Sequence, residues 1–472
     1  MSRSRPMVAA LAATLALVLA GCSGGSGSSS GGGGGTTAVK CPVDALAKAS
    51  GPVTVTFWHA MNGEANLNAI TKLIDEYEAQ QPKVNVKLIN QTGYRESFEK
   101  YKAGLRTGDL PDLAQIEDTA TQQMVDTRSI VPMSACIKAD KYDTSDFLKR
   151  TIAYYSIEGT LWPMPFNVSN PVLYYDRNAF SAAGLDPDKP PATTAEVHQF
   201  SEKLKATGYE YGYGLKLDPW VIEQMSAKAG VPYVNNGNGR DARATKVAFD
   251  NKVGREVFTW MHDMVDQQLA VTNSAEGPSA FDNLLGIRSK RNAMTVDTSA
   301  ALGQISKVLA SGEGGGVSLG VGPMPGPSGS GSRSGGILVG GAALYMPKRS
   351  SPEKQAAAWD LVKFLVSPER QAEWAAATGY VPLRTSATDS PVIRDLWARE
   401  PGYRVAYDQL VTGVENTATA GPVVGPYQEI RDAVLAAEQR MFSGGATPDA
   451  AITGAARDAN RALAEYNARV GG

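Results

Sequence analysis

Val-Thr-Val-Thr-Phe at residues 53–57 opens the stretch of sequence that decides the fold, which runs to residue 116. The β-branched, alternating pattern of these five residues predicts a strand. Val-Asn-Val-Lys-Leu-Ile at residues 84–89 and Leu-Ala-Gln-Ile at residues 113–116 predict two more strands, and the amphipathic segments 67–80 and 94–106 predict helices between them. Strands and helices that alternate so closely favour an α/β fold, a parallel sheet with helices on its faces. Ligands bind such sheets at the carboxyl ends of the strands, so we expect the site there.

The first 21 residues have the features of an export signal. Arg3 and Arg5 precede an apolar run at residues 7–19, which is too short to span a bilayer as a mature helix. The Leu-Ala-Gly-Cys that ends at Cys22 is similar to the lipobox of bacterial lipoproteins, in which the cysteine is diacylated. We therefore predict a lipoprotein signal peptide over residues 1–21 and a lipid anchor on Cys22. The alternative is an ordinary signal peptide in which Cys22 has no role.

A Gly/Ser-rich segment at residues 22–38 separates this signal from the body of the chain, and we expect it to act as a flexible tether. The body has too many residues for one compact core, so two lobes are expected. The predicted first lobe comprises residues 39–150 and 293–345. The predicted second lobe comprises residues 151–292 and 346–472.

Charge and cysteine content narrow the class of protein. The formal net charge is −2 and no basic run is present, which argues against nucleic acid as a partner. No segment after the signal has eighteen continuous apolar residues, so no further membrane span is predicted. Cys41 and Cys136 remain after lipidation of Cys22, and in an oxidising compartment they can form one disulfide. Two free buried thiols are the alternative.

The residues needed for catalysis are not arranged in a recognisable pattern. The three histidines lie far apart in the sequence without metal-ligand spacing, and no phosphate-binding loop is present. Glu117 and Asp118 are adjacent, so on a strand they would face opposite sides and could not act as a glycosidase pair. We therefore expect no enzymatic activity, no metal and no cofactor.

Six short motifs along the body together resemble the family 1 extracellular solute-binding proteins of carbohydrate ABC importers. They occur in the order of that family: Phe-Trp-His at 57–59, Leu-Arg-Thr-Gly-Asp-Leu-Pro-Asp at 105–112, Pro-Phe-Asn-Val-Ser-Asn-Pro-Val-Leu-Tyr-Tyr at 165–175, Ala-Met-Thr at 293–295, Gly-Gly-Ala at 340–342 and Thr-Gly-Tyr-Val-Pro at 378–382. The resemblance implies a two-lobe, type II periplasmic-binding-protein-like fold. Each lobe would be a mostly parallel sheet flanked by helices, with the ligand in the cleft between the lobes.

Within that family the sequence is most similar to the subgroup that binds glycerol 3-phosphate and glycerophosphodiesters. Matching motif positions imply a ligand site whose members are Tyr94, Asp118, Ser169, Leu217, Trp220, Asp297, Thr298, Gly341, Tyr380 and Arg431. Three of these positions depart from the subgroup. Asp118 replaces a glutamate, Thr298 replaces a serine beside an unexpected Asp297, and Leu217 stands where the subgroup can hold a tryptophan three residues before Trp220.

The chemistry of these side chains allows both a functional and a structural interpretation. Arg431 could grip a phosphate, or it could be a solvated surface cation beside Glu429 and Asp432. The aromatic side chains could stack on a glycerol, a sugar or a quaternary ammonium, or they could belong to the core. Ser169 and Thr298 could cap local structure, and Asp118 could be the N-cap of a helix.

Three functions are compatible with these observations. The first is a binding lipoprotein that delivers glycerol 3-phosphate or a glycerophosphodiester, such as glycerophosphocholine, to an ABC permease. The second is an oligosaccharide-binding lipoprotein of a carbohydrate importer, and the third is a secreted hydrolase. For the first two we expect a monomer, held at the outer face of the cytoplasmic membrane by its lipid, with the permease subunits as partners.

Overall fold

The computed structural model describes residues 39–275, 277–311, 316–328 and 335–471. The predicted signal peptide, the lipid site at Cys22 and the tether lie outside these residues. Within the described ranges, no helix combines the length and the apolar character that crossing a membrane requires.

The first sheet is built around three parallel strands, as the opening stretch of sequence predicts, and the structure gives their order as β2-β1-β3. β13 adds to β3 in the antiparallel direction and also pairs with β7 and β4. The strands are β1 (Val53–His59), β2 (Val84–Asn90), β3 (Leu113–Glu117), β4 (Ile130–Val131), β7 (Met164–Ser169) and β13 (Gly340–Pro347).

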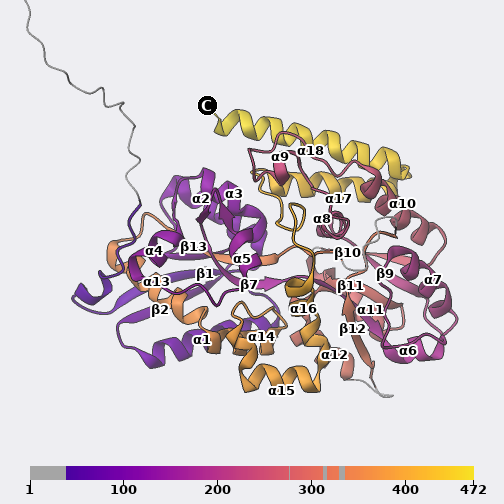
Figure 1. Cartoon of the computed structure of the whole chain (residues 1–472), viewed down its shortest axis with the longest axis horizontal. Helices are drawn as coiled ribbons and strands as arrows, with labels where there is room; N and C mark the ends of the chain where they lie inside the picture. The colour runs from indigo at the N-terminus through magenta and orange to yellow at the C-terminus, as the bar shows by residue number, and fades with distance from the viewer. Residues whose placement is uncertain (1–38, 276, 312–315, 329–334, 472) are drawn as a thin grey trace, which may run out of the picture. The chain divides into compact units, whose positions relative to one another are not determined.

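Helices cover both faces of this sheet. In Figure 1, α2 and α3 lie on one face, and α1 and α14 lie on the other. The helices associated with this sheet are α1 (Glu64–Gln80), α2 (Tyr94–Thr107), α3 (Thr121–Asp126), α4 (Met133–Asp140), α5 (Lys149–Tyr154), α13 (Pro352–Leu365) and α14 (Pro368–Thr378).

The second sheet repeats the same plan. Its strands β10, β9 and β11 are parallel to one another. β8 pairs with β11 in the antiparallel direction, and β12 pairs with β8 in the antiparallel direction. Both sheets are therefore mixed rather than mostly parallel. The strands are β8 (Pro171–Asp176), β9 (Tyr211–Leu217), β10 (Ala270–Ser274), β11 (Asn292–Thr298) and β12 (Leu319–Pro323), and a separate short hairpin is formed by β5 (Ser156–Ile157) and β6 (Thr160–Leu161).

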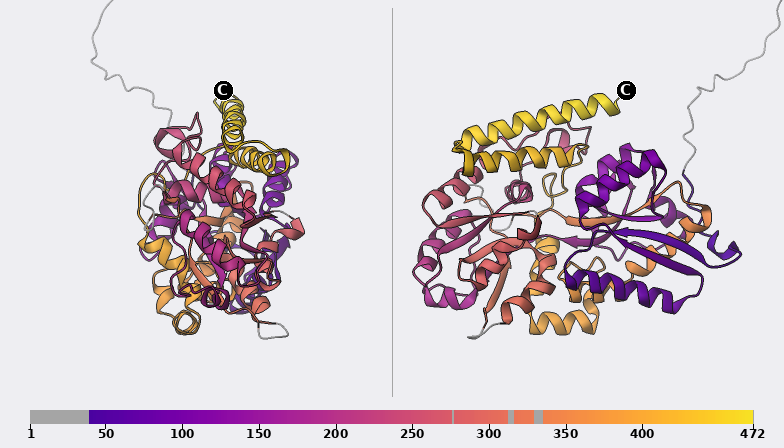
Figure 2. Two further views of the ribbon diagram at one scale, coloured as in Figure 1. Left: turned by 90° about the vertical axis from the view of Figure 1, so that its right-hand side faces the viewer. Right: turned by 180° about the vertical axis from the view of Figure 1, so that it is seen from behind.

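The remaining helices surround the second sheet or link it to the first. Figure 2 shows α17 and α18 packed along each other at the end of the chain, and the two views agree on this arrangement. These helices are α6 (Arg177–Ala182), α7 (Thr194–Lys205), α8 (Pro219–Lys228), α9 (Asn235–Asn238), α10 (Lys252–Asp266), α11 (Asp282–Arg288), α12 (Leu302–Ala310), α15 (Pro391–Arg399), α16 (Val405–Thr412), α17 (Tyr427–Gly444) and α18 (Pro448–Val470).

Strand pairing differs from the predicted division into lobes. β11 and β12 fall in residues 293–345, which were expected in the first lobe, but they pair in the second sheet. β7 was expected in the second lobe, yet it pairs with β13 in the first sheet. The sequence pattern identifies a strand but not its partner, because the partner is chosen by packing between distant segments. The chain therefore passes between the sheets after β7 and again between β12 and β13.

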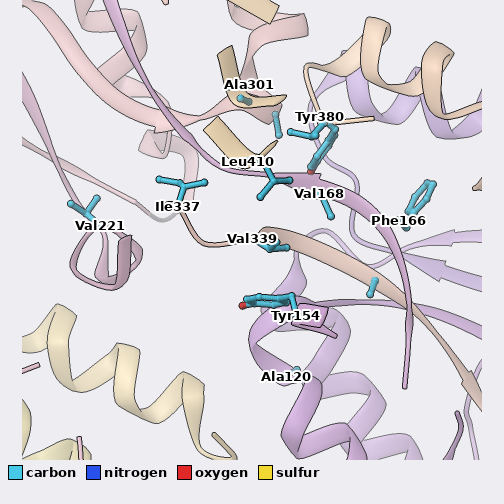
Figure 3. Packing of buried hydrophobic residues seen from close by; sticks show 14 of the residues in the cluster. Ala120, Tyr154, Phe166, Val168, Val221, Ala301, Ile337, Val339, Tyr380 and Leu410 are labelled. Carbon is cyan, nitrogen blue, oxygen red and sulfur yellow. The ribbon is translucent and has the colours of Figure 1, made fainter. Parts of the chain in front are cut away.

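A single cluster of buried hydrophobic side chains connects the two sheets. It contains Phe57 and Ile116 from the first sheet as well as Leu173 and Val296 from the second. Figure 3 shows part of this cluster, in which residues from separate segments such as Val168, Val339, Ile337 and Leu410 gather around the passage between the sheets. This continuous core holds the strand ends of both sheets around the same space.

One disulfide links the start of the body to α4, one of the helices associated with the first sheet. Cys41 and Cys136 are bonded, with their Cα atoms 4.8 Å apart and a sequence separation of 95. This confirms the predicted bridge and removes the alternative of two free thiols.

A ligand cavity at the strand ends

A cavity of about 350 Å³ lies where the strands of both sheets end. The first sheet supplies residues that follow β1 and β3 and the end of β7, and the second supplies the ends of β9 and β11. This is the position expected for a ligand site in an α/β sheet. Nine of the ten predicted site residues line it: Tyr94, Asp118, Ser169, Trp220, Asp297, Thr298, Gly341, Tyr380 and Arg431.

Leu217 is the predicted residue that does not line this cavity. It lines a neighbouring hollow of about 170 Å³ together with Thr272 and Gln439. Successive side chains of a strand point to opposite faces, and in β9 it is Lys216, not Leu217, that reaches the main cavity. Leu217 therefore does not open space in the main cavity beside Trp220.

Arg431 is the most strongly bound cation of the site. Its Nε and Nη2 donate to the two carboxylate oxygens of Glu223 at 2.7 and 2.8 Å, and its Nη1 donates to Glu117 at 2.9 Å. The Glu223 side chain is 1% exposed, so this is a buried, bidentate ion pair. Burial alone would lower the pKa of Arg431, but the two carboxylates raise it well above its ordinary value. Arg431 is therefore not the solvated surface cation of the alternative interpretation.

Asp118 lies beside this cluster and is almost completely buried. Burial and the nearby Glu117 raise the pKa of Asp118 to about 8, against the opposing effects of Arg431 and of the Tyr154 hydroxyl. Tyr154 donates to Asp118 at 2.5 Å. The Asp118 side chain does not cap a helix, because the hydrogen bond that it accepts comes from this hydroxyl. At neutral pH the carboxyl is largely protonated, which makes the site less negative than its sequence suggests.

A second buried ion pair lines the same cavity. Lys216 donates to both oxygens of Asp297 at 3.1 and 2.9 Å, and Asn283 donates to Asp297 at 3.0 Å. The two charged side chains are 10% and 3% exposed. Asp297, unexpected in the sequence, therefore fixes a lysine that would otherwise be free to bind a ligand phosphate.

The aromatic groups and the paired glycines shape the remaining walls. Tyr380 stacks on the buried Trp374 with ring centroids 5.5 Å apart, so its ring has a fixed orientation. A Cβ at Gly340 would lie 2.7 Å from the Trp220 ring, and a Cβ at Gly341 would lie 2.0 Å from the carbonyl oxygen of Asn167. Gly341 also has a φ of +104°, which other residues rarely adopt. The glycine pair therefore marks a close approach of the chain to the Trp220 ring and to the Asn167 carbonyl.

The hydroxyl groups have two different roles. Thr298 accepts a hydrogen bond from the Ala300 amide at 3.2 Å, so the capping interpretation is correct for it although it also lines the cavity. Ser169 is 4% exposed and lines the cavity at the end of β7. Within the described residues no protein partner is seen for its hydroxyl, which leaves it available to a ligand.

Sequence reasoning missed several charged residues of this site. Glu223, Glu117 and Lys216 were not proposed, although they hold or balance the predicted residues. Two of them carried a usable signal. Glu223 interrupts the apolar helix α8, and Lys216 lies between two leucines of a strand, and a charge in such a position needs a buried partner.

In the described part of the chain, no group of three or more His, Cys, Asp or Glu is placed to hold a metal ion. His59 is buried, and burial lowers its pKa to about 4, so it is neutral and its Nδ1 accepts from the Met61 amide at 3.3 Å. The cavity is lined by polar and charged groups held in fixed directions around a small space, an arrangement suited to recognition of a polar ligand.

Two sheets joined through one core, with a polar cavity at their strand ends, define a two-lobe ligand-binding protein. The family model described as bacterial extracellular solute-binding protein matches residues 72–401, and the chain belongs to that family. It is a substrate-binding protein of an ABC importer rather than an enzyme, and it works outside the cytoplasm.

Similar proteins agree with this assignment. The chain is 28% identical over 428 residues to the sn-glycerol-3-phosphate-binding periplasmic protein UgpB of Escherichia coli strain K12, covering 89% of this chain and 95% of that protein. Among solved structures, UgpB of Mycobacterium tuberculosis in complex with glycerophosphocholine has a TM-score of 0.73 at 22% identity, covering 89% and 100% of the two chains. The GacH receptor of Streptomyces glaucescens has a TM-score of 0.72 at 22% identity, covering 88% and 99%.

Proposed function

We propose that the protein captures a glycerophosphodiester with a cationic head group, glycerophosphocholine foremost, and delivers it to an ABC permease. The observation that carries the proposal is the charge of the cavity. Among the residues that the structure describes, three cationic side chains line it, Arg95, Lys216 and Arg431. Five acidic side chains of the described ranges line it as well: Glu117, Asp118, Asp218, Asp297 and Asp432.

Each of these cations already has a carboxylate partner in the described structure. Arg431 is paired with Glu117 and with Glu223 behind the wall, Lys216 with Asp297, and Arg95 with Asp432 at 2.6 Å. A phosphate monoester brings close to two negative charges into the cavity. These charges would be poorly compensated, because the cations there are already paired with carboxylates. A phosphodiester brings one negative charge, and a choline group attached to it brings a compensating positive charge.

The cavity also contains groups suited to a quaternary ammonium. The Trp220 and Phe281 side chains line it, and both can present an aromatic face to a cation. Asp218 and Glu117 supply negative charge nearby without needing to form a directed hydrogen bond, which a quaternary ammonium cannot donate. Arg431 still has two N–H groups beyond its three bonds to carboxylates, and these can donate to the phosphodiester oxygens.

Similarity to known proteins supports the same choice of ligand class. The relatives carry the name of a glycerol-3-phosphate-binding protein, and one similar structure holds glycerophosphocholine. These relatives support a glycerol phosphate compound as the class of ligand. The preference for a diester within that class rests on the paired cations described above.

Calorimetric titration with glycerophosphocholine, glycerol 3-phosphate, maltose and trehalose tests the proposal. We expect glycerophosphocholine to bind at least roughly tenfold more tightly than glycerol 3-phosphate, and the two sugars to bind weakly or not at all. Tighter binding of glycerol 3-phosphate would contradict the charge argument.

An oligosaccharide ligand is the second candidate. Carboxylates that accept hydroxyl groups and aromatic faces that stack on a sugar ring both occur in this cavity, and the similar structures include a cyclic alpha-maltosyl-1,6-maltose binding protein from Arthrobacter globiformis. Maltose or trehalose binding without phosphodiester binding in the same titration would favour this candidate.

The proposal includes a lipid anchor on Cys22, which keeps the protein near its permease at the outer face of the cytoplasmic membrane. Its basis is the lipobox-like sequence and the Gly/Ser-rich segment that follows it. Labelling with a palmitate analogue should mark the wild type and not the Cys22→Ser variant, which should be released from membranes. A variant that remains membrane-bound would contradict the anchor.

A further inference from the structure

A chain of hydrogen bonds runs from the backbone to the two tyrosines of the cavity wall. The Ala60 amide donates to Gln115 Oε1 at 2.8 Å, Gln115 Nε2 donates to Asn167 Oδ1 at 2.7 Å, and Asn167 Nδ2 donates to the Tyr94 hydroxyl at 2.8 Å. Tyr94 and Tyr380 then share a hydrogen bond of 3.1 Å between their hydroxyl oxygens. Gln115 and Asn167 are both completely buried, and neither lines the cavity.

The direction of each bond in this chain follows from its first member. A backbone N–H can only donate, so the oxygen of the Gln115 amide must face Ala60 and its nitrogen must face Asn167. The Asn167 amide is then fixed in the same way, with its oxygen toward Gln115 and its nitrogen toward Tyr94. Neither amide can be turned around without placing two donors or two acceptors against each other.

This direction decides what the two tyrosines can offer a ligand. Tyr94 accepts from Asn167, so its own proton is directed to Tyr380 or into the cavity. If Tyr94 donates to Tyr380, the Tyr380 proton is left for the ligand, and if Tyr380 donates to Tyr94, the Tyr94 proton is left. In both arrangements the pair presents one O–H donor to the cavity.

We propose that Gln115 and Asn167 are positioning residues that hold Tyr94 and Tyr380 as a hydrogen-bond donor and so select a ligand with an acceptor oxygen at this wall. The inference rests on the proposed function and deepens it: the acceptor is an oxygen of the phosphodiester. The carboxylates of Asp297 and Asp218 also line the cavity, from the second sheet and the start of α8, and accept rather than donate. A glycerophosphodiester is thereby oriented, with its phosphodiester toward the tyrosines and its cationic end toward Asp297 and Asp218.

The hydrogen-bonded chain from Gln115 through Asn167 to Tyr94 and Tyr380 is called the tyrosine relay. The Gln115→Glu variant tests this relay from a position outside the cavity. The ionised carboxylate introduced at position 115 would present an oxygen to Asn167, which would turn the Asn167 amide and place its oxygen against Tyr94. Tyr94 would then donate to Asn167, Tyr380 would donate to Tyr94, and no proton would remain for the ligand. Loss of one hydrogen bond to a charged group predicts roughly tenfold to hundredfold weaker binding of glycerophosphocholine.

Burial disfavours the ionised form of a glutamate, so the titration is run from pH 5 to pH 9.5. The loss relative to wild type should grow as the pH rises and the introduced carboxyl group ionises. Wild type measured in parallel accounts for the other titratable groups near the relay and the cavity, namely His59, Glu117, Asp118, Tyr94 and Tyr380.

Gln371→Glu is the matched control. Gln371 is also completely buried and also uses both ends of its amide, donating to the Leu365 carbonyl at 3.0 Å and accepting from the Leu383 amide at 3.2 Å. The Gln371→Glu variant makes the same chemical change without altering a residue of the tyrosine relay. Affinities of Gln115→Glu and Gln371→Glu that agree at every pH would overturn the proposal.

Phenylalanine variants test the shared donor without any change in ionisation. Tyr94→Phe and Tyr380→Phe each leave one hydroxyl, so each should weaken glycerophosphocholine binding by less than about fivefold. The double variant should weaken it roughly tenfold to hundredfold, more than the product of the two single effects. Multiplicative effects would contradict a donor held in common.

The same titrations separate this inference from the proposed function. A wild type that binds maltose but no phosphodiester would refute the glycerophosphodiester function. A wild type that binds glycerophosphocholine, together with a Gln115→Glu variant that behaves like its control, would refute the relay alone.

Discussion

Arg431 and Arg240 are both largely buried, but their surroundings differ in kind. Arg431 is held by the carboxylates of Glu223 and Glu117 and lines the cavity. Arg240 is held by backbone carbonyl groups, with Nε donating to Gly421 at 2.7 Å. Its Nη1 and Nη2 donate to four further carbonyls, those of Ala153, Ser156, Tyr154 and Ala420.

The difference lies in how many N–H groups each guanidinium still has to offer. Five hydrogen bonds use all five N–H groups of Arg240, so none is left for a ligand. Arg431 uses three of its five N–H groups, and its charge is balanced before any ligand arrives. Burial lowers the pKa of Arg240, whereas carboxylates raise that of Arg431, which agrees with this contrast.

Replacing Arg240 should produce the largest effect. Arg240→Met leaves carbonyls of two separate chain segments without donors, and we expect it to lower the free energy of unfolding by about 3–5 kcal/mol. Urea denaturation measures this loss. Arg240→Lys, which keeps the charge but offers three donors, should recover part of it, and an Arg240→Met variant as stable as wild type would break the comparison.

Replacing Arg431 should mainly affect binding when its partner Glu223 is neutralised in the same variant. Arg431→Met alone strands the buried Glu223 and should cost about 3–5 kcal/mol of stability. The double variant Arg431→Met/Glu223→Gln removes both charges, so its unfolding free energy should return to near the wild-type value. Its affinity for glycerophosphocholine should still fall by about 2–5 kcal/mol, as measured by calorimetry. Binding within twofold of wild type would show that Arg431 is structural, like Arg240.

Asp118 links the two regions, because Tyr154 donates to it while the Tyr154 carbonyl is held by Arg240. The pKa of Asp118 is about 8 in the folded protein and 3.8 as the reference for the unfolded chain, so the folded state binds the proton more strongly. This contribution makes stability fall as the pH rises from about 4 to about 8. Asp118→Asn should therefore be increasingly more stable than wild type over that range. Thermal unfolding at pH 5, 7 and 9 measures it, and a difference that does not change with pH would contradict the raised pKa.

Leu217→Trp should have the smallest effect. Leu217 faces the neighbouring hollow rather than the main cavity, so a tryptophan there should change the affinities for glycerophosphocholine and glycerol 3-phosphate by less than about threefold. Calorimetry with both ligands checks this. A selective loss of the diester would instead show that the two spaces are connected when ligand is bound.

Most of the local structure could be predicted from the sequence, because periodicity reports directly on strands and helices. The three strands and two helices of residues 53–116 agree closely with β1, α1, β2, α2 and β3. Sheet membership could not be predicted for β7, β11 and β12, since pairing depends on segments far away in the chain.

The residues of the candidate site also divide into those that could be predicted from the sequence and those that could not. The nine predicted residues that line the cavity came from motif positions shared with a family, which carry information about distant contacts that a single pattern lacks. Glu223 could have been inferred from its place in an apolar helix. Arg240 could not, because it stands in an Asn- and Gly-rich segment that has the composition of an exposed loop.

The Cys41–Cys136 disulfide records which side of the membrane the chain has reached. Cytosolic thiols are kept reduced, whereas the compartment outside the cytoplasm allows disulfides to persist. The two cysteines are 95 residues apart, so the bond can form only when both ends of that long segment share the oxidising compartment. The fraction of chains whose Cys41 and Cys136 resist alkylation without a reductant is therefore a measure of export, independent of ligand and permease.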